Sequence, residues 1–152
     1  MPVVSTATKV LTIVFDVDLT LLDTPVFRPG NDPAAWEEQV FKYTYPPVNG
    51  AVAGVERMLR DHHGAVHLLT ARSSRLEVVT RANLREHFPA LAGSELSMGY
   101  EGVSSGGFEY KMQRLAGIIG RASGPIAVVD DDERVRRWVR GVDDFYHAPW
   151  CW

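Results

Sequence analysis

Two aspartates, Asp16 and Asp18, directly follow the apolar run at residues 10–15. A short β-branched run bounded by polar residues is typical of a buried strand in a parallel sheet. Both carboxylates would then lie at the carboxyl end of that strand, where open α/β sheets bind their ligands. Carboxylates are costly to bury, and folding requires no such pair there. The pair therefore predicts a site of chemistry.

Further polar residues follow or lie between other expected elements. Thr70 ends the apolar run 65–69, Asp130 follows the run 125–129, and Lys111 lies early in an expected helix. The carboxyl ends of neighbouring parallel strands converge on one crevice. We therefore expect one site that contains Asp16, Asp18, Thr70 and Asp130, with Lys111 reaching in.

Expected strands alternate with expected helices along the chain. The strands cover 10–15, 65–69, part of 91–100, 125–129 and 144–147, and the helices cover about 34–42, 51–62, 73–87, 108–119 and 132–140. This alternation predicts an α/β fold, a doubly wound, Rossmann-like parallel sheet of about five strands. With 152 residues, we expect a single domain over 1–152.

The composition and charge of the chain limit the classes of function that fit it. Apolar residues make up 45% and charged residues 23%, as in ordinary globular proteins. The net charge of -3 gives no general attraction to polyanions, so any nucleic acid contacts must come from local basic clusters. The lone cysteine, Cys151, allows no internal disulfide and fits a reducing compartment. With neither a membrane-spanning run nor a signal peptide in the sequence, we expect a cytoplasmic protein without membrane contact.

The ordered set Asp16-x-Asp18-x-Thr20, Thr70, Lys111 and Val128-Val129-Asp130-Asp131 resembles the four motifs of the haloacid dehalogenase superfamily, whose members are mostly phosphatases. The resemblance covers nearly the whole chain. One departure is Leu19, where many members carry Gly.

The resemblance implies a reaction through an aspartyl-phosphate. Asp16 would attack phosphorus, while Asp18 would protonate the leaving oxygen and then deprotonate the water that cleaves the intermediate. Thr20, a predicted substrate-binding residue, would orient Asp18 and its turn. The Thr70 hydroxyl would donate to a phosphoryl oxygen, and Lys111 would add a fixed cation.

A Mg²⁺ cofactor fits this chemistry because it is a hard ion that prefers oxygen ligands and neutralises phosphoryl charge. Asp16 and Asp130 would supply carboxylate ligands, and Asp18 its backbone carbonyl. Asp131 is a further ligand candidate. Asp132 either contacts the metal or caps the following helix.

Several of these residues also allow simpler interpretations. Thr70 could be a helix cap, and Lys111 a solvated lysine. Arg72 and Arg75 are predicted to contact substrate phosphate or the backbone, or else to be solvated arginines.

The substrate is expected to be set by a minimal cap-like insert at about 24–49. The run from Asp130 to Trp138 and the step Thr70-Ala71-Arg72 are similar to the phosphatase domain of polynucleotide kinase-phosphatases, which removes 3′-phosphates from nucleic acid ends. A nucleic acid 3′-phosphatase is therefore one hypothesis. A nucleotidase or other small-metabolite phosphatase is the second, and a non-catalytic binding module the third. No protein partner is predicted.

Two groups of aromatic residues have open roles. Those of the insert either stack on a base or pack a small helix. The aromatic end of the chain, residues 149–152, packs back on the domain, lines an interface or touches substrate. The insert residues in question are Trp36, Phe41, Tyr43 and Tyr45.

Overall fold

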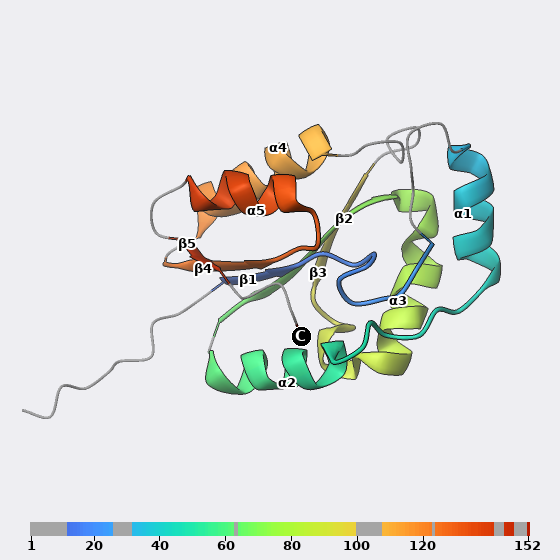
Figure 1. Cartoon of the computed structure of the whole chain (residues 1–152), viewed down its shortest axis with the longest axis horizontal. Helices are drawn as coiled ribbons and strands as arrows, with labels where there is room; N and C mark the ends of the chain where they lie inside the picture. Colours follow the sequence, from blue (N-terminus) through green and yellow to red (C-terminus); the bar gives the residue numbers. More distant parts are fainter. Residues whose placement is uncertain are drawn as a thin grey trace, which may run out of the picture.

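The computed structural model describes residues 12–25, 32–62, 64–99, 108–122, 124–141, 145–147 and 152. A parallel sheet lies at the centre of these residues (Figure 1). In spatial order it contains β3 (Glu95–Gly99), β2 (Val66–Ser73), β1 (Thr12–Phe15), β4 (Ile126–Val129) and β5 (Phe145–His147). Every neighbouring pair is parallel. The predicted α/β class and Rossmann-like parallel arrangement are confirmed.

Helices cover both faces of the sheet. The helices α4 (Phe108–Arg121) and α5 (Glu133–Arg140) lie on one face, and α2 (Ala51–Asp61) and α3 (Glu77–His87) lie on the other (Figure 1). The helix α1 (Pro33–Lys42) lies beyond the edge of the sheet, in the predicted insert. None of the helices among the described residues is both long and apolar enough to cross a membrane.

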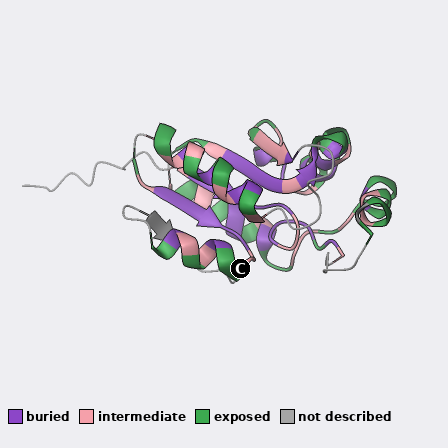
Figure 2. Cartoon of the chain, turned by 90° about the horizontal axis from the view of Figure 1, so that it is seen from above, coloured by how far each residue is buried: buried purple, intermediate pink, exposed green. Residues whose placement is uncertain are grey.

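The apolar core is divided by the sheet, because successive side chains of a strand point to opposite faces. Ile13 and Phe15 pack with residues of α2 and α3, whereas Val14 packs with residues of α4 and α5. Figure 2 shows the buried strands between helices whose outer surfaces are exposed. Burial of both faces explains why the strands are continuous apolar runs rather than alternating ones.

The second strand is longer than predicted. It runs to Ser73, past the expected end at residue 69, because its pairing with β3 shifts between Leu69 and Ser73. Ser73 then accepts a hydrogen bond from the Arg75 amide and begins the short 3-10 helix η1 (Ser74–Leu76) ahead of α3. Thr70 and Arg72 therefore lie within β2. A second 3-10 helix, η2 (Pro89–Leu91), follows α3.

Two aspartates cap helices close to where the sequence predicts them to begin. Asp32 caps α1 through the Ala34 amide, and Asp132 caps α5 through the Arg134 amide. Residues 10–11, the glycine-rich loop 102–107 and residue 144, at the start of the last predicted strand, lie outside the described residues.

Candidate active site

The site lies where β1 and β4 end side by side. Asp16 follows β1, and its amide donates to the carbonyl oxygen of Val129, the last residue of β4 (2.9 Å). Asp130 and Asp131 come next in the chain. Carboxylate oxygens of Asp16, Asp130 and Asp131 lie within 4.8 Å of one another. The strand ends therefore bring these three predicted residues together.

Lys111, from α4, bridges two of these carboxylates. Its Nζ lies 2.7 Å from Asp16 Oδ1 and 2.9 Å from Asp130 Oδ2. The lysine is only 8% exposed, so the alternative of a solvated lysine is wrong. The first turn of α4 thus places the ammonium group of Lys111 between two acids that are far apart in the sequence.

Burial dominates the electrostatics of this cluster. Desolvation raises the pKa of Asp16 to about 7 and the pKa of Asp130 to about 6, although Lys111 lowers both. Burial lowers the pKa of Lys111, but its two carboxylate partners outweigh this and raise it. When ionised, the three carboxylates of the cluster face one ammonium group. The excess negative charge and the all-oxygen donor set fit a hard divalent cation.

Thr20 links two of the acids. Its Oγ1 donates to Asp16 Oδ2 (2.9 Å) and accepts from the Asp131 amide (3.0 Å), with Asp131 Oδ1 at 3.3 Å. The expected link from this hydroxyl to Asp18 is not among its hydrogen bonds in the described structure. Thr20 is fully buried, and its hydroxyl connects Asp16 to the Asp131 backbone.

Asp18 has different partners. Arg72 Nη2 lies 2.6 Å from Asp18 Oδ1, and Arg72 Nε lies 3.0 Å from Oδ2. Thr24 Oγ1 donates to Asp18 Oδ1 at 2.8 Å. Burial raises the pKa of Asp18, but the ion pair with Arg72 and the Thr24 hydrogen bond lower it below its usual value. The two aspartates of the motif are therefore held separately, one beside Lys111 and one beside Arg72.

A left-handed residue separates the two aspartates from Thr20. Leu19 has φ of 62°, a conformation that L side chains rarely adopt. Its amide donates to the Leu22 carbonyl (2.7 Å), which closes a tight turn after β1. The turn follows the end of β1 at Phe15 and places the Thr20 hydroxyl within hydrogen-bond distance of Asp16. In the sequence, the only signal of this conformation is that Leu19 stands where many members of the resembled superfamily carry Gly.

The remaining predicted residues lie on or next to β2. Thr70 is fully buried, and its Oγ1 accepts from the Arg72 amide (3.1 Å), so it is a strand residue rather than a helix cap. Arg72 is 2% exposed and also donates to Thr80 Oγ1 (2.9 Å), so it is not a solvated arginine. Arg75 is one of the residues that line a groove between α1 and η1.

Asp132 belongs to the helix and not to the cluster of acids. Its side chain accepts from the Arg134 amide (2.9 Å) and pairs with the Arg134 guanidinium. Its own amide donates to Asp130 Oδ1 (2.9 Å). The capping alternative is therefore confirmed. The geometry also adds Arg136, whose Nη1 donates to the carbonyl oxygens of Asp130 and Asp131 (3.0 and 2.7 Å).

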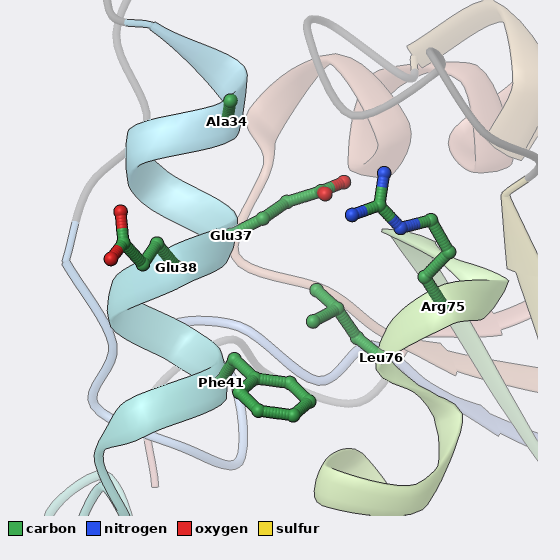
Figure 3. Close-up of a pocket in the computed structure, with 6 residues that line it drawn as sticks. All are labelled: Ala34, Glu37, Glu38, Phe41, Arg75 and Leu76. Atoms are coloured by element: carbon green, nitrogen blue, oxygen red, sulfur yellow. The ribbon is translucent and has the colours of Figure 1, made fainter.

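A groove of about 320 Å³ runs between α1 and η1 (Figure 3). In Figure 3, Glu37 and Arg75 point toward each other across it, and Phe41 and Leu76 form its lower walls. The Arg72 guanidinium lies 5.9 Å from the centre of the Trp36 ring. This contact connects α1 to the ion pair of Arg72 with Asp18. The residues that line the groove are Ala34, Glu37, Glu38, Phe41, Arg75 and Leu76.

The aromatic residues of the insert do not form a common core. Phe41 is 65% exposed and Tyr43 is 60% exposed, so core packing does not explain either of them. Trp36 is partly buried, and its indole donates to the Pro25 carbonyl (3.0 Å). Two aromatic side chains are thus open to solvent, and one of them, Phe41, lines the groove.

Comparisons with protein-family models and with curated proteins give no match to this chain.

Proposed function

We propose that this chain is a Mg²⁺-dependent phosphomonoester hydrolase of the haloacid dehalogenase type. The main support is the position of Asp16, a buried carboxylate that Lys111 bridges to Asp130, with a second acid, Asp18, two residues away in the chain. Four motifs that resemble that superfamily supply these residues in order. A folded domain has no need for this costly cluster.

The acidic cluster fits the proposed cation. Asp16, Asp130 and Asp131 would hold it, because their oxygens already converge within 4.8 Å. When bound, Mg²⁺ would neutralise phosphoryl charge, which otherwise repels an anionic nucleophile. Lys111 contributes positive charge to the same place through its contacts with Asp16 and Asp130.

Asp16 is the proposed nucleophile. Lys111 and Thr20 each contact one of its oxygens, which fixes the direction of the carboxylate. A carboxylate oxygen would bond to phosphorus as the ester P–O bond breaks, giving an aspartyl-phosphate and an alkoxide. Water would then attack the phosphorus and release inorganic phosphate, restoring the carboxylate.

Asp18 is the proposed acid and base. It would give a proton to the leaving alkoxide and later take one from the attacking water. Its pairing with Arg72 favours the ionised state, which suits the second step. The first step needs Asp18 protonated, so we infer that the pair with Arg72 loosens when substrate binds.

A nucleic acid 3′-end is the proposed substrate. The insert is small, and the exposed rings of Phe41 and Tyr43 offer flat surfaces on which bases stack. The similarity to polynucleotide 3′-phosphatases supports the same choice. The groove favours a second candidate, because its volume of about 320 Å³ lies at the lower end of the range for small-molecule sites. That candidate is a nucleotidase.

The test is phosphate release from a 3′-phosphorylated DNA oligonucleotide and a panel of mononucleotides, each with Mg²⁺ or with EDTA. We expect Mg²⁺-dependent release, fastest from the oligonucleotide. Asp130→Asn should abolish it, whereas Asp61→Asn, at an exposed position on α2, should not. Preference for one mononucleotide would indicate the nucleotidase. No release from any substrate would favour the non-catalytic binding module.

A further inference from the structure

Trp152 packs against the sheet and the turn after β1. Its indole Nε1 donates to the backbone carbonyl of Thr20 at 2.8 Å. Its ring stacks on Phe15, the last residue of β1, with 6.4 Å between the ring centres. In Figure 1 the end of the chain lies between α2 and the sheet. Trp152 thus packs back on the domain, which is one of the three alternatives for the aromatic end of the chain.

Gly54 of α2 makes room for the indole, and Gly50, the N-cap of α2, lies against the Cβ and backbone of Trp152. A Cβ atom at Gly54 would lie 2.0 Å from Trp152 Cε3, a distance that atoms cannot adopt. A Cβ atom at Gly50 would lie 3.0 Å from Trp152 Cβ. Gly50 has φ of 81°, which by itself favours glycine, whereas Gly54 is an ordinary helical residue. Glycine inside a helix is unfavourable, which makes the fit to Trp152 a physical reason for Gly54.

The hydrogen bond to Thr20 leads directly to the acids. The Thr20 carbonyl and hydroxyl belong to one residue, and that hydroxyl contacts Asp16 Oδ2 and the Asp131 amide. The preceding residue, Leu19, is in the left-handed region and cannot hold this conformation without support. The indole therefore holds the strained turn at its buried end.

We propose that Trp152 is a positioning residue of the candidate active site, acting through the Thr20 carbonyl to hold Asp16 and Asp131 in place. The proposal rests on the proposed function for its kinetic consequence. Its structural consequence, a fixed Thr20 turn, is independent of that function. The indole N–H is the critical group, because the ring alone would supply only packing.

Trp152→Phe removes the N–H and keeps an aromatic ring. The matched control is Trp138→Phe, since Trp138 is partly buried and packs against the core on the opposite face of the sheet. We expect kcat to fall roughly 10- to 100-fold in Trp152→Phe, because small displacements of reacting groups cost rate on this scale. KM should change little, and Trp138→Phe should retain kcat. Equal kcat values in the two variants would overturn the proposal.

A double-mutant cycle separates positioning from general packing. Thr20→Val removes the hydroxyl that connects the turn to Asp16. If Trp152 acts through Thr20, the loss of kcat caused by Trp152→Phe should be much smaller in the Thr20→Val background. Purely additive losses would overturn the proposal.

Amide hydrogen exchange tests the same idea in a protein without detectable activity, so failure of the proposed function remains distinguishable. The Asp131 amide reports the bond to Thr20 Oγ1, and the Leu22 amide reports the turn through its bond to the Val17 carbonyl. Both should exchange about 10-fold faster or more in Trp152→Phe than in Trp138→Phe. Unchanged exchange at both amides would overturn the proposal.

Gly54→Ala provides a second variant that leaves the indole intact. The added methyl group collides with the ring, so we expect a lower melting temperature and faster exchange of the Asp131 amide. In a Trp152→Ala background the same substitution should raise the melting temperature, because Ala is the better helix former. If Gly54→Ala raised the melting temperature in both backgrounds, Trp152 would not occupy this place.

Discussion

Arg72 binds both carboxylate oxygens of Asp18, with Nη2 2.6 Å from Oδ1 and Nε 3.0 Å from Oδ2. The arginine lies in the irregular end of β2, and the aspartate follows the neighbouring strand β1. Two adjacent strands thus hold the proposed acid and base in one orientation. Asp16, two residues earlier in the chain, contacts Lys111 and Thr20 instead.

Arg72→Gln should lower the free energy of unfolding by about 3 kcal/mol at pH 7. This is the lower end of the cost of leaving a buried charge unpaired, because the Asp18 side chain is still 22% exposed. The difference from the wild type should narrow as the pH falls below 3.8. The reason is that Arg72 lowers the pKa of Asp18 from its usual value of 3.8, and that stabilisation is present above 3.8 and lost below it. Urea unfolding at several pH values measures it.

The control for this pair is Arg60→Gln, an exposed arginine beside Asp61. It should change stability by less than about 0.5 kcal/mol. A loss of similar size in both variants would contradict the account of the Asp18 pair.

Asp16→Asn should make the metal-free protein more stable at pH 7. Burial raises the pKa of Asp16 to about 7, so the folded state binds a proton more tightly than the unfolded state. Stability contributed by that proton is full below pH 3.8 and is lost as the pH rises toward 7. The variant should therefore lack part of the decline that the wild type shows between pH 4 and 7 in EDTA.

Adding Mg²⁺ should reverse this order. Ligands that bind only the folded state stabilise it by mass action, and Asp16 is a proposed ligand. Melting temperatures of both proteins, recorded in EDTA and in Mg²⁺, test the prediction. A wild type that gains no stability from Mg²⁺ would contradict the proposed metal site.

Leu19→Val should cost about 1–2 kcal/mol of stability. Its φ of 62° is least tolerated by β-branched residues. Leu19→Gly should cost little, because relief of strain offsets the loss of the side chain. Leu96→Val, in strand β3, is the control and favours a β-branched residue. If both valine variants behaved alike in chemical unfolding, the left-handed turn would be wrong.

Much of this arrangement could be predicted from sequence because it depends on strand ends. Asp16 and Asp130 follow apolar runs, and parallel strands bring their ends together. The Asp18–Arg72 pair could not be predicted, since it depends on the irregular pairing that extends β2 past residue 69. The hydrogen bond of Thr20 to Asp16 could not be predicted either, because it depends on the left-handed turn at Leu19. Long-range contacts such as Trp152 with Thr20 leave no periodic signal.

Phe41→Ala should raise KM for a 3′-phosphorylated oligonucleotide about 10-fold, with kcat nearly unchanged. Loss of one stacked base costs about 1–3 kcal/mol. Because Phe41 is 65% exposed, its removal should not affect stability. Val78→Ala, at an 84% exposed position on α3, is the matched control. Steady-state kinetics measure KM of the variants for the oligonucleotide and for a mononucleotide. An equal rise of KM for both substrates would indicate that the groove is a nucleotide site.

The most direct test of the central claim compares phosphate release by the wild type, Asp16→Asn and Asp61→Asn on the 3′-phosphorylated oligonucleotide with Mg²⁺. We expect release by the wild type and by Asp61→Asn. Asp16→Asn should release none, because an amide cannot replace the attacking carboxylate. Release by Asp16→Asn at the wild-type rate would contradict the central claim.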